Sequence, residues 1–188
     1  MKKLINNYLS ILNRAIKDSH LEEDIETLAH ALLKAWKENR TVFICGNGGS
    51  AANAIHLEND FTYGVACKNN DHGMNMTALT SNSSVLTCLA NDISYDDIFS
   101  EQLKSKYRAG DILIVLSGSG NSRNIIKALK MAKRLNMESF AILGFDGGEA
   151  KNLSDYPIHL QVDDMQISED FQLIVGHLCM KWLSEKRV

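Results

Sequence analysis

The sequence predicts a doubly wound α/β fold, in which a five-stranded parallel sheet carries helices on both faces and follows an N-terminal helical pair. Three observations lead to this prediction. From residue 41 onward, short apolar runs alternate with amphipathic stretches. The runs are too apolar for either side of a strand to face water, as in parallel sheets covered on both faces. The length of 188 residues suits one domain with a buried core and is too short for two ordinary ones.

The first forty residues are predicted to be helical, because their apolar residues recur at three- and four-residue spacing over Leu4–Ile16 and Ile25–Trp36. These apolar stripes could pack on their own domain or against another copy of the chain. We therefore expect a single domain over 1–188, in which 1–40 serves packing or oligomerisation and 41–188 forms the α/β core.

Strands and helices alternate through the rest of the chain. The apolar runs predict strands at Thr41–Cys45, Asn75–Leu79, Asp111–Leu116, Ser139–Leu143 and Tyr156–Leu160. The amphipathic stretches predict helices at about Ser50–Phe61, Ser83–Asn91, Ile98–Tyr107, Ser122–Leu135 and Ser168–Ser184. Loops are expected at Ala66–Gly73 and Gly144–Gly148, where turn-forming residues gather.

Composition narrows the class of partner. The net charge is −3 and no block of Lys and Arg occurs, which argues against nucleic acid because phosphate tracks need clustered positive charge. No apolar run approaches the ~20 residues that span a bilayer, and the N-terminus lacks the apolar stretch of a signal peptide. We expect a cytoplasmic protein that binds a small molecule, with no nucleic-acid or membrane partner.

Two loops at predicted strand ends are rich in glycine and serine. In open parallel sheets, ligands bind beyond the carboxyl ends of the strands, where loops lead into helices. The loops Gly46–Ser50 and Ser117–Ser122 occupy such positions. Their glycines let backbone N–H groups face a ligand, and the helix starts that follow favour an anion. Three hydroxyls in the second loop suit a phosphate monoester without a lysine.

An ordinary structural explanation exists for each loop alone, with Ser50 and Ser122 serving only as helix N-caps. Both loops at corresponding ends of one sheet favour the phosphate site instead. Neither loop has the spacing of a nucleoside triphosphate loop or of a dinucleotide fingerprint.

Four polar residues on two predicted helices are candidates for chemistry. His56 and Asp60 lie four residues apart on one helix face, which suits a base and its partner or two metal ligands, although surface pairs show the same spacing. Glu169 and His177 on the last helix would lie ~12 Å apart along a straight axis. Either that helix begins later than predicted, or the two residues serve sites shared between subunits.

Asn91 and Asp92 add two polar groups at the end of another predicted helix, where a C-terminal cap explains Asn91 equally well.

Taken in order, these motifs resemble the SIS (sugar isomerase) domain proteins of the phosphoheptose isomerase type. The resemblance rests on Gly46-Asn47-Gly48-Gly49-Ser50-Ala51-Ala52-Asn53-Ala54 with His56, Leu89-Ala90-Asn91-Asp92, Ser117-Gly118-Ser119-Gly120-Asn121-Ser122, and a last helix with His177. It covers nearly the whole chain and implies a flavodoxin-like fold.

The resemblance implies a homotetramer with active sites at subunit interfaces. It implies interconversion of sedoheptulose 7-phosphate and D-glycero-D-manno-heptose 7-phosphate for bacterial lipopolysaccharide or capsule synthesis. Asp60 would be the base and His177 the acid. Zn²⁺ would be held by His56, Asp60, Glu169 and His177. The expected substrate-binding residues are Asn47, Gly48, Gly49, Ser50, Asn91, Asp92, Ser117, Gly118, Ser119, Ser122 and Glu169, with the serines holding the phosphate.

Four positions depart from the pattern of that family. Asp60 replaces the usual glutamate base, and Glu169 replaces the usual glutamine. Gly64 replaces a common arginine, and Gln166 replaces an aspartate. Two carboxylates and two histidines form a better divalent-metal set than the usual one. Two alternatives remain open: a non-catalytic sugar-phosphate sensor or adaptor, and a metal-dependent isomerase or epimerase of another sugar phosphate.

Overall fold

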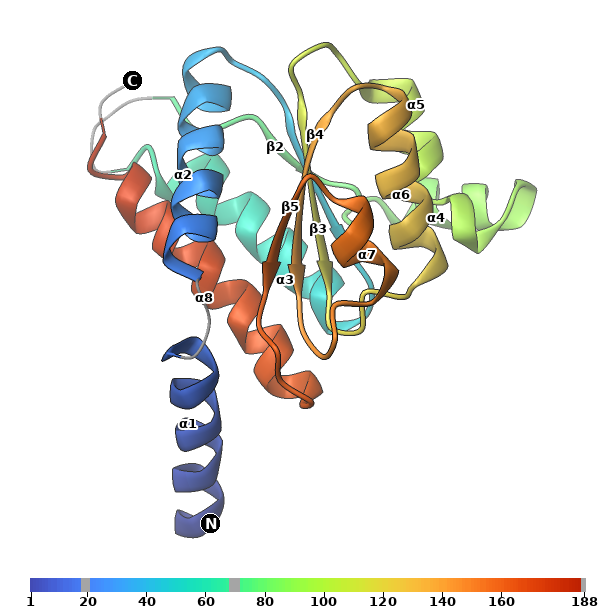
Figure 1. Ribbon diagram of the computed structural model, residues 1–188. Coiled ribbons are helices and arrows are strands. Elements are labelled where there is room, and N and C mark those ends of the chain that lie inside the picture. The colour runs from blue at the N-terminus through green and yellow to red at the C-terminus, as the bar shows by residue number, and fades with distance from the viewer. Residues whose placement is uncertain (18–20, 68–71, 187–188) are drawn as a thin grey trace.

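Five parallel strands form one sheet in the order β2-β1-β3-β4-β5 (Figure 1). This computed structural model describes residues 1–17, 21–67 and 72–186. The strands are β1 (Val42–Gly46), β2 (Met76–Ala78), β3 (Ile112–Ser117), β4 (Glu138–Leu143) and β5 (Tyr156–His159). This strand order is that of the flavodoxin-like doubly wound sheet. The predicted fold class is thus confirmed.

Helices cover both faces of the sheet, as Figure 1 shows. The α-helices are α1 (Lys2–Lys17), α2 (Leu21–Lys37), α3 (Gly49–Asn59), α4 (Ser83–Asp92), α5 (Ser100–Lys106), α6 (Arg123–Arg134), α7 (Gly148–Leu153) and α8 (Met165–Leu183). A π-helical turn, η1 (Asp60–Gly64), continues α3, and a 3₁₀ turn, η2 (Tyr95–Asp97), follows α4. The N-terminal helical pair is present, and α1 extends away from the rest of the chain.

The core has two halves, one on each face of the sheet. Alternate side chains of a strand point to opposite faces. Ile44 therefore packs with α2, α3 and α8, and its neighbour Phe43 packs with α5 and α6. All five residues of β1 are buried. This burial on both faces explains why the strands read as continuous apolar runs.

Most element boundaries differ from the predicted ones by one to three residues, and three points need comment. The last helix begins at Met165 rather than Ser168, because the Asp164 side chain accepts a hydrogen bond from the Ile167 N–H and caps the helix there. The six-residue α7 was not predicted, since so short a helix has little periodicity. The predicted loop Ala66–Gly73 includes residues 68–71, which lie outside the described residues.

Of the helices in the described ranges, none combines the length and apolar composition that crossing a bilayer requires.

Candidate functional site

The two glycine- and serine-rich loops lie side by side at the switch point of the sheet. The strand β1 pairs with β2 on one side and with β3 on the other. The chain therefore crosses from one side of β1 to the other after β2, and the carboxyl ends of β1 and β3 lie at this crossover. Gly46 at the end of β1 is in register with Leu116 near the end of β3. Ligands of doubly wound sheets bind at this kind of position.

The loops enclose a pocket of about 270 Å³, which we call the serine pocket. It is lined by Asn47, Gly48, Gly49, Ser50, Leu116, Ser117, Gly118, Ser119, Ser122, Met165 and Glu169. The structure therefore brings together all the predicted substrate-binding residues except Asn91 and Asp92. Gly48, not Ser50, precedes α3 as its N-cap, with a positive φ of 54°. Ser122 precedes α6 without a capping hydrogen bond from its side chain.

Internal hydrogen bonds orient three of the serine hydroxyls. The Ser117 Oγ accepts from the Gly120 N–H at 3.0 Å, and the Ser119 Oγ accepts from the Asn121 N–H at 3.3 Å. The Ser50 Oγ accepts from the buried amide of Gln172 at 3.0 Å. A hydroxyl that accepts a hydrogen bond still has its own proton to donate. Each of these serines can therefore donate to an anion.

A pair of amide side chains joins the two loops. Asn47 Nδ2 donates to Asn124 Oδ1, and Asn124 Nδ2 donates back to Asn47 Oδ1, both at 2.8 Å. Asn124 also accepts from the Ile125 N–H and is only 2% exposed. The Tyr95 hydroxyl donates to Asn47 Oδ1 at 3.0 Å. Asn47 is thus held in place with one N–H left for a ligand.

Asn91 and Asp92 lie outside the serine pocket, at the exposed end of α4. Asn91 Nδ2 donates to Asp92 Oδ1 at 2.8 Å, and this bond, with a second from Cys88, lowers the pKa of Asp92. Because α4 continues through Asp92, with Ile93 as its C-cap, the alternative that Asn91 caps the helix is wrong. Their assignment to substrate binding stays a prediction.

Three of the four predicted metal ligands lie close together: His56, Asp60 and His177. We call them the His-Asp-His cluster. The two histidine Nε2 atoms lie 3.0 Å apart. Asp60 Oδ2 lies 3.4 Å from His56 Nε2 and 3.3 Å from His177 Nε2. His56 lies in the last turn of α3, Asp60 is the first residue of η1, and α8 supplies His177.

The spacing of these three atoms fits a tetrahedral metal ion. Ligand atoms bound to Zn²⁺ at about 2.0–2.1 Å in tetrahedral geometry lie about 3.3 Å from one another. The distances in the cluster, 3.0 to 3.4 Å, match this value. Two imidazoles and a carboxylate are also ligands that Zn²⁺ accepts, and a fourth position would remain open.

Glu169, the fourth predicted ligand, lies in the serine pocket and not in the cluster. Glu169 and His177 both belong to α8, so the possibility that the helix begins after Glu169 is wrong. Eight residues of helix separate them by ~12 Å along the axis. Within one chain, the cluster and the serine pocket are therefore distinct sites.

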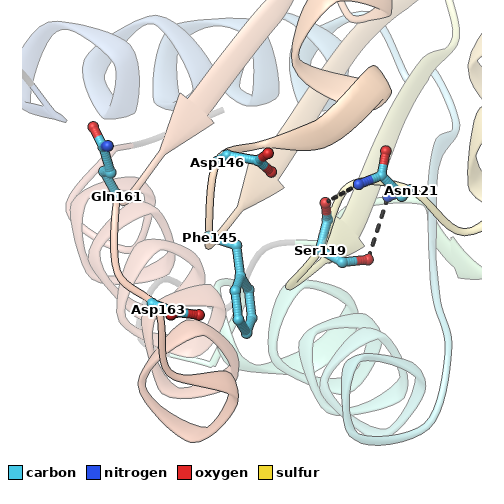
Figure 2. A pocket seen from close by; sticks show the side chains of 6 residues that line it. All are labelled: Ser119, Asn121, Phe145, Asp146, Gln161 and Asp163. Atoms are coloured by element: carbon cyan, nitrogen blue, oxygen red, sulfur yellow. Dashed lines mark hydrogen bonds between the residues drawn. The ribbon is translucent and has the colours of Figure 1, made fainter.

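A second depression of about 480 Å³ adjoins the serine pocket and was not predicted. Ser119 belongs to both, and Asn121, Phe145, Asp146, Gln161 and Asp163 complete the lining (Figure 2). Figure 2 shows the ring of Phe145 between Asp163 and Ser119. Phe145 has a φ of 45°, an unusual value for a bulky residue.

The family of the chain follows from comparison with known proteins. A family model described as the SIS domain matches residues 5–144. The chain belongs to the SIS domain family. A phosphoheptose isomerase from Clostridium acetobutylicum is 35% identical to this SIS domain protein over 93% of this chain and 88% of its own length. Another, from Akkermansia muciniphila, is 36% identical over 92% of this chain and 90% of its own.

A solved structure agrees with these relatives. Phosphoheptose isomerase GmhA from Neisseria gonorrhoeae superimposes on this SIS domain protein with a TM-score of 0.87. The two are 27% identical, and the match covers 98% of this chain and 99% of that one. The resemblance to SIS domains of the phosphoheptose isomerase type, first seen in the motifs, is thus confirmed.

Sequence reasoning missed the residues that support the serine pocket of this SIS domain. Asn124 and Gln172 are polar residues on the buried faces of α6 and α8. Their positions among apolar neighbours were a usable signal, because a buried amide needs hydrogen-bond partners. Tyr95 is exposed in the short η2 turn, and nothing in the sequence pattern marked it.

Proposed function

We propose that this protein is a phosphoheptose isomerase that interconverts sedoheptulose 7-phosphate and D-glycero-D-manno-heptose 7-phosphate. It would act in the cytoplasm, in the synthesis of heptose for bacterial lipopolysaccharide or capsule. The observation that carries the proposal is the serine pocket, whose oriented hydroxyls suit a phosphate, in a chain with a nearby acid–base cluster. Relatives named phosphoheptose isomerase, about one-third identical over most of the chain, support it.

The chemistry needs one base, one acid and stabilisation of negative charge on oxygen. Aldose–ketose isomerisation moves a proton between adjacent carbons through an enediol. Asp60 would remove the proton from one carbon and return it to the other. His177, whose Nε2 faces the cluster, would donate a proton from Nδ1 to the carbonyl oxygen and take up a proton from the hydroxyl on the neighbouring carbon of the enediol. Asp60 Oδ2 faces the two histidines, which leaves Oδ1 for the substrate proton.

The proposal includes a divalent metal, Zn²⁺, held by the His-Asp-His cluster. Glu169 from a second copy would supply the fourth ligand. When bound, the ion would stabilise negative charge that develops on the substrate oxygens. The donor set and its spacing support this assignment.

The proposed assembly is a homotetramer whose active sites lie between subunits. Two observations support it. Glu169 and His177 lie eight residues apart on α8, ~12 Å along its axis, so the proposed four-ligand metal site needs Glu169 from a second copy. In addition, α1 exposes the apolar side chains of Leu4, Ile5 and Leu9, which a second copy can cover.

Solvent exchange tests the isomerase. The protein should exchange the C1 or C2 proton of sedoheptulose 7-phosphate with deuterium from solvent, measured by proton NMR in buffer that contains Zn²⁺. Asp60→Asn should lower the exchange rate by about 10²- to 10⁴-fold, the usual effect of losing a general base. Glu58→Gln removes a carboxylate from the same helix and should leave the rate unchanged.

An absence of exchange with this and related ketose phosphates in the wild type would overturn the proposal. If sugar phosphates still stabilised both the wild type and Asp60→Asn without turnover, the alternative of a sensor or adaptor would replace it.

Metal content tests the proposed zinc site. Protein purified without chelator should contain about one divalent ion per chain, measured by inductively coupled plasma spectroscopy. His56→Ala should lose most of it, because the change removes one of the four proposed protein ligands. His30→Ala, on α2, should retain the metal. Unchanged content in His56→Ala would show that the cluster does not hold the ion.

A further inference from the structure

The carboxylate of Glu169 lies inside the serine pocket, against the start of α3. A Cβ atom added to Gly49, the first residue of α3, would lie 2.4 Å from both carboxylate oxygens. A larger residue at position 49 would therefore displace the Glu169 carboxylate from its present position. Within residues 1–17, 21–67 and 72–186, no hydrogen bond or ion pair engages the carboxylate. Its negative charge is thus not neutralised by a cation in the described part of the chain.

This carboxylate lies at the start of a helix, where a negative charge is favoured. The first N–H groups of a helix lack partners within the helix, and the helix dipole adds partial positive charge there. This is the reason that phosphates bind at helix N-termini. The Glu169 carboxylate lines the same pocket and lies in the same favourable field that a bound phosphate would use. Two anions in one small pocket also repel each other.

We propose that Glu169 is an internal competitor for the phosphate, and that its carboxylate must leave the serine pocket before a phosphate group binds. The inference rests on the proposed function in taking the serine pocket as the phosphate site, and its coupling to metal rests also on the proposed zinc site and assembly. The movement is small, because Glu169 is partly exposed and its side chain can rotate while α8 stays in place. The Asn53 amide bonds to the Glu169 backbone carbonyl and holds the main chain during this rotation.

A divalent cation gives the displaced carboxylate a destination. The His-Asp-His cluster of a second copy has an open ligand position, and Glu169 is the carboxylate proposed to fill it. A cation that draws Glu169 out of the pocket also makes room for the phosphate. Metal and phosphate binding are then positively coupled, and each raises the affinity of the other by the same factor.

Calorimetric titration with inorganic phosphate tests whether the Glu169 carboxylate competes with phosphate. In chelator-treated protein, Glu169→Gln should bind phosphate about tenfold more tightly than the wild type, within the roughly 5- to 150-fold range of coupled binding. Asp163→Asn is the matched control, since it removes one negative charge from the neighbouring depression and leaves the serine pocket intact. It should bind phosphate as the wild type does.

The coupling is tested by repeating the titrations with Zn²⁺. The ion should tighten phosphate binding to the wild type about tenfold and should have a smaller effect on Glu169→Gln. Equal affinities of wild type and Glu169→Gln without metal, or binding by neither, would overturn the proposal. So would an equal effect of Zn²⁺ on both. A failure of isomerase activity, with the titration results as expected, would overturn only the proposed reaction.

Discussion

At the scale of single residues, the geometry of the serine pocket depends on one buried amide. Asn124 holds Asn47 by two reciprocal hydrogen bonds of 2.8 Å, and Asn47 lies in the other loop. The pair therefore fixes the separation of the two loops that would surround the phosphate. Loops without such a link adopt several separations, and ordering them on binding costs affinity.

Asn124→Asp should weaken both folding and phosphate binding. The carboxylate keeps the acceptor for Asn47 but loses the donated hydrogen bond, and it buries a negative charge beside the pocket. We expect the free energy of unfolding to fall by roughly 1–3 kcal/mol, the cost of an unsatisfied buried polar group. Urea unfolding and phosphate titration measure the two effects. Asn152→Asp, on the exposed surface of α7, should change neither. Wild-type phosphate affinity in Asn124→Asp would show that the amide pair does not set the loop geometry.

At the scale of elements, a close helix crossing forms the His-Asp-His cluster. A Cβ atom at Gly176 would lie 2.3 Å from Leu57 Cδ2, so α8 and α3 approach more closely than larger residues would allow. This approach brings His177 to His56. At the same point, α3 passes into the π-helical turn that begins at Asp60. Such turns are common at functional sites because they redirect side chains.

The sequence predicted the long elements well and the local irregularities poorly. Buried strands and amphipathic helices such as α6 carry strong periodic patterns, and the phosphate loops carry distinctive glycine and serine spacing. The π-helical turn and α7 depend on tertiary packing, which no local pattern records. The spacing of His56 and Asp60 predicted that they meet. Only the fold shows that His177 joins them and that Glu169 does not.

At the scale of the whole molecule, α1 is the element with least support from its own chain. Every residue of α1 is at least partly exposed, with Leu4 at 63% and Leu9 at 56%. Its clearest polar link is Tyr8, whose hydroxyl donates to Asp170 on α8. Burial and this hydrogen bond raise the pKa of Tyr8. This exposed apolar stripe is the reason that the proposed assembly uses α1 as a contact between copies.

Leu9→Asp should disrupt the assembly, because it places a charge in the apolar contact. Light scattering after size-exclusion chromatography should show a fall from a tetramer to smaller species. Asn7→Asp adds the same charge roughly 200° around the helix, on another face of α1, and should leave the mass unchanged. A tetramer that persists in Leu9→Asp would exclude α1 from the interface, and a monomeric wild type would overturn the proposed assembly.

The helix α8 contributes to both sites, because Met165 and Glu169 line the serine pocket and His177 belongs to the cluster. Glu169 and His177 are eight residues apart. Eight residues at about 100° each place their side chains roughly 80° apart around the axis. Inserting or deleting a single residue between them would turn one side chain away by roughly 100° and shift it by about 1.5 Å. We therefore expect the length of this stretch of α8 to stay constant over evolutionary time, as a spacer between two sites must, and Gln172 and Gly176 within it to be retained for their contacts with α3.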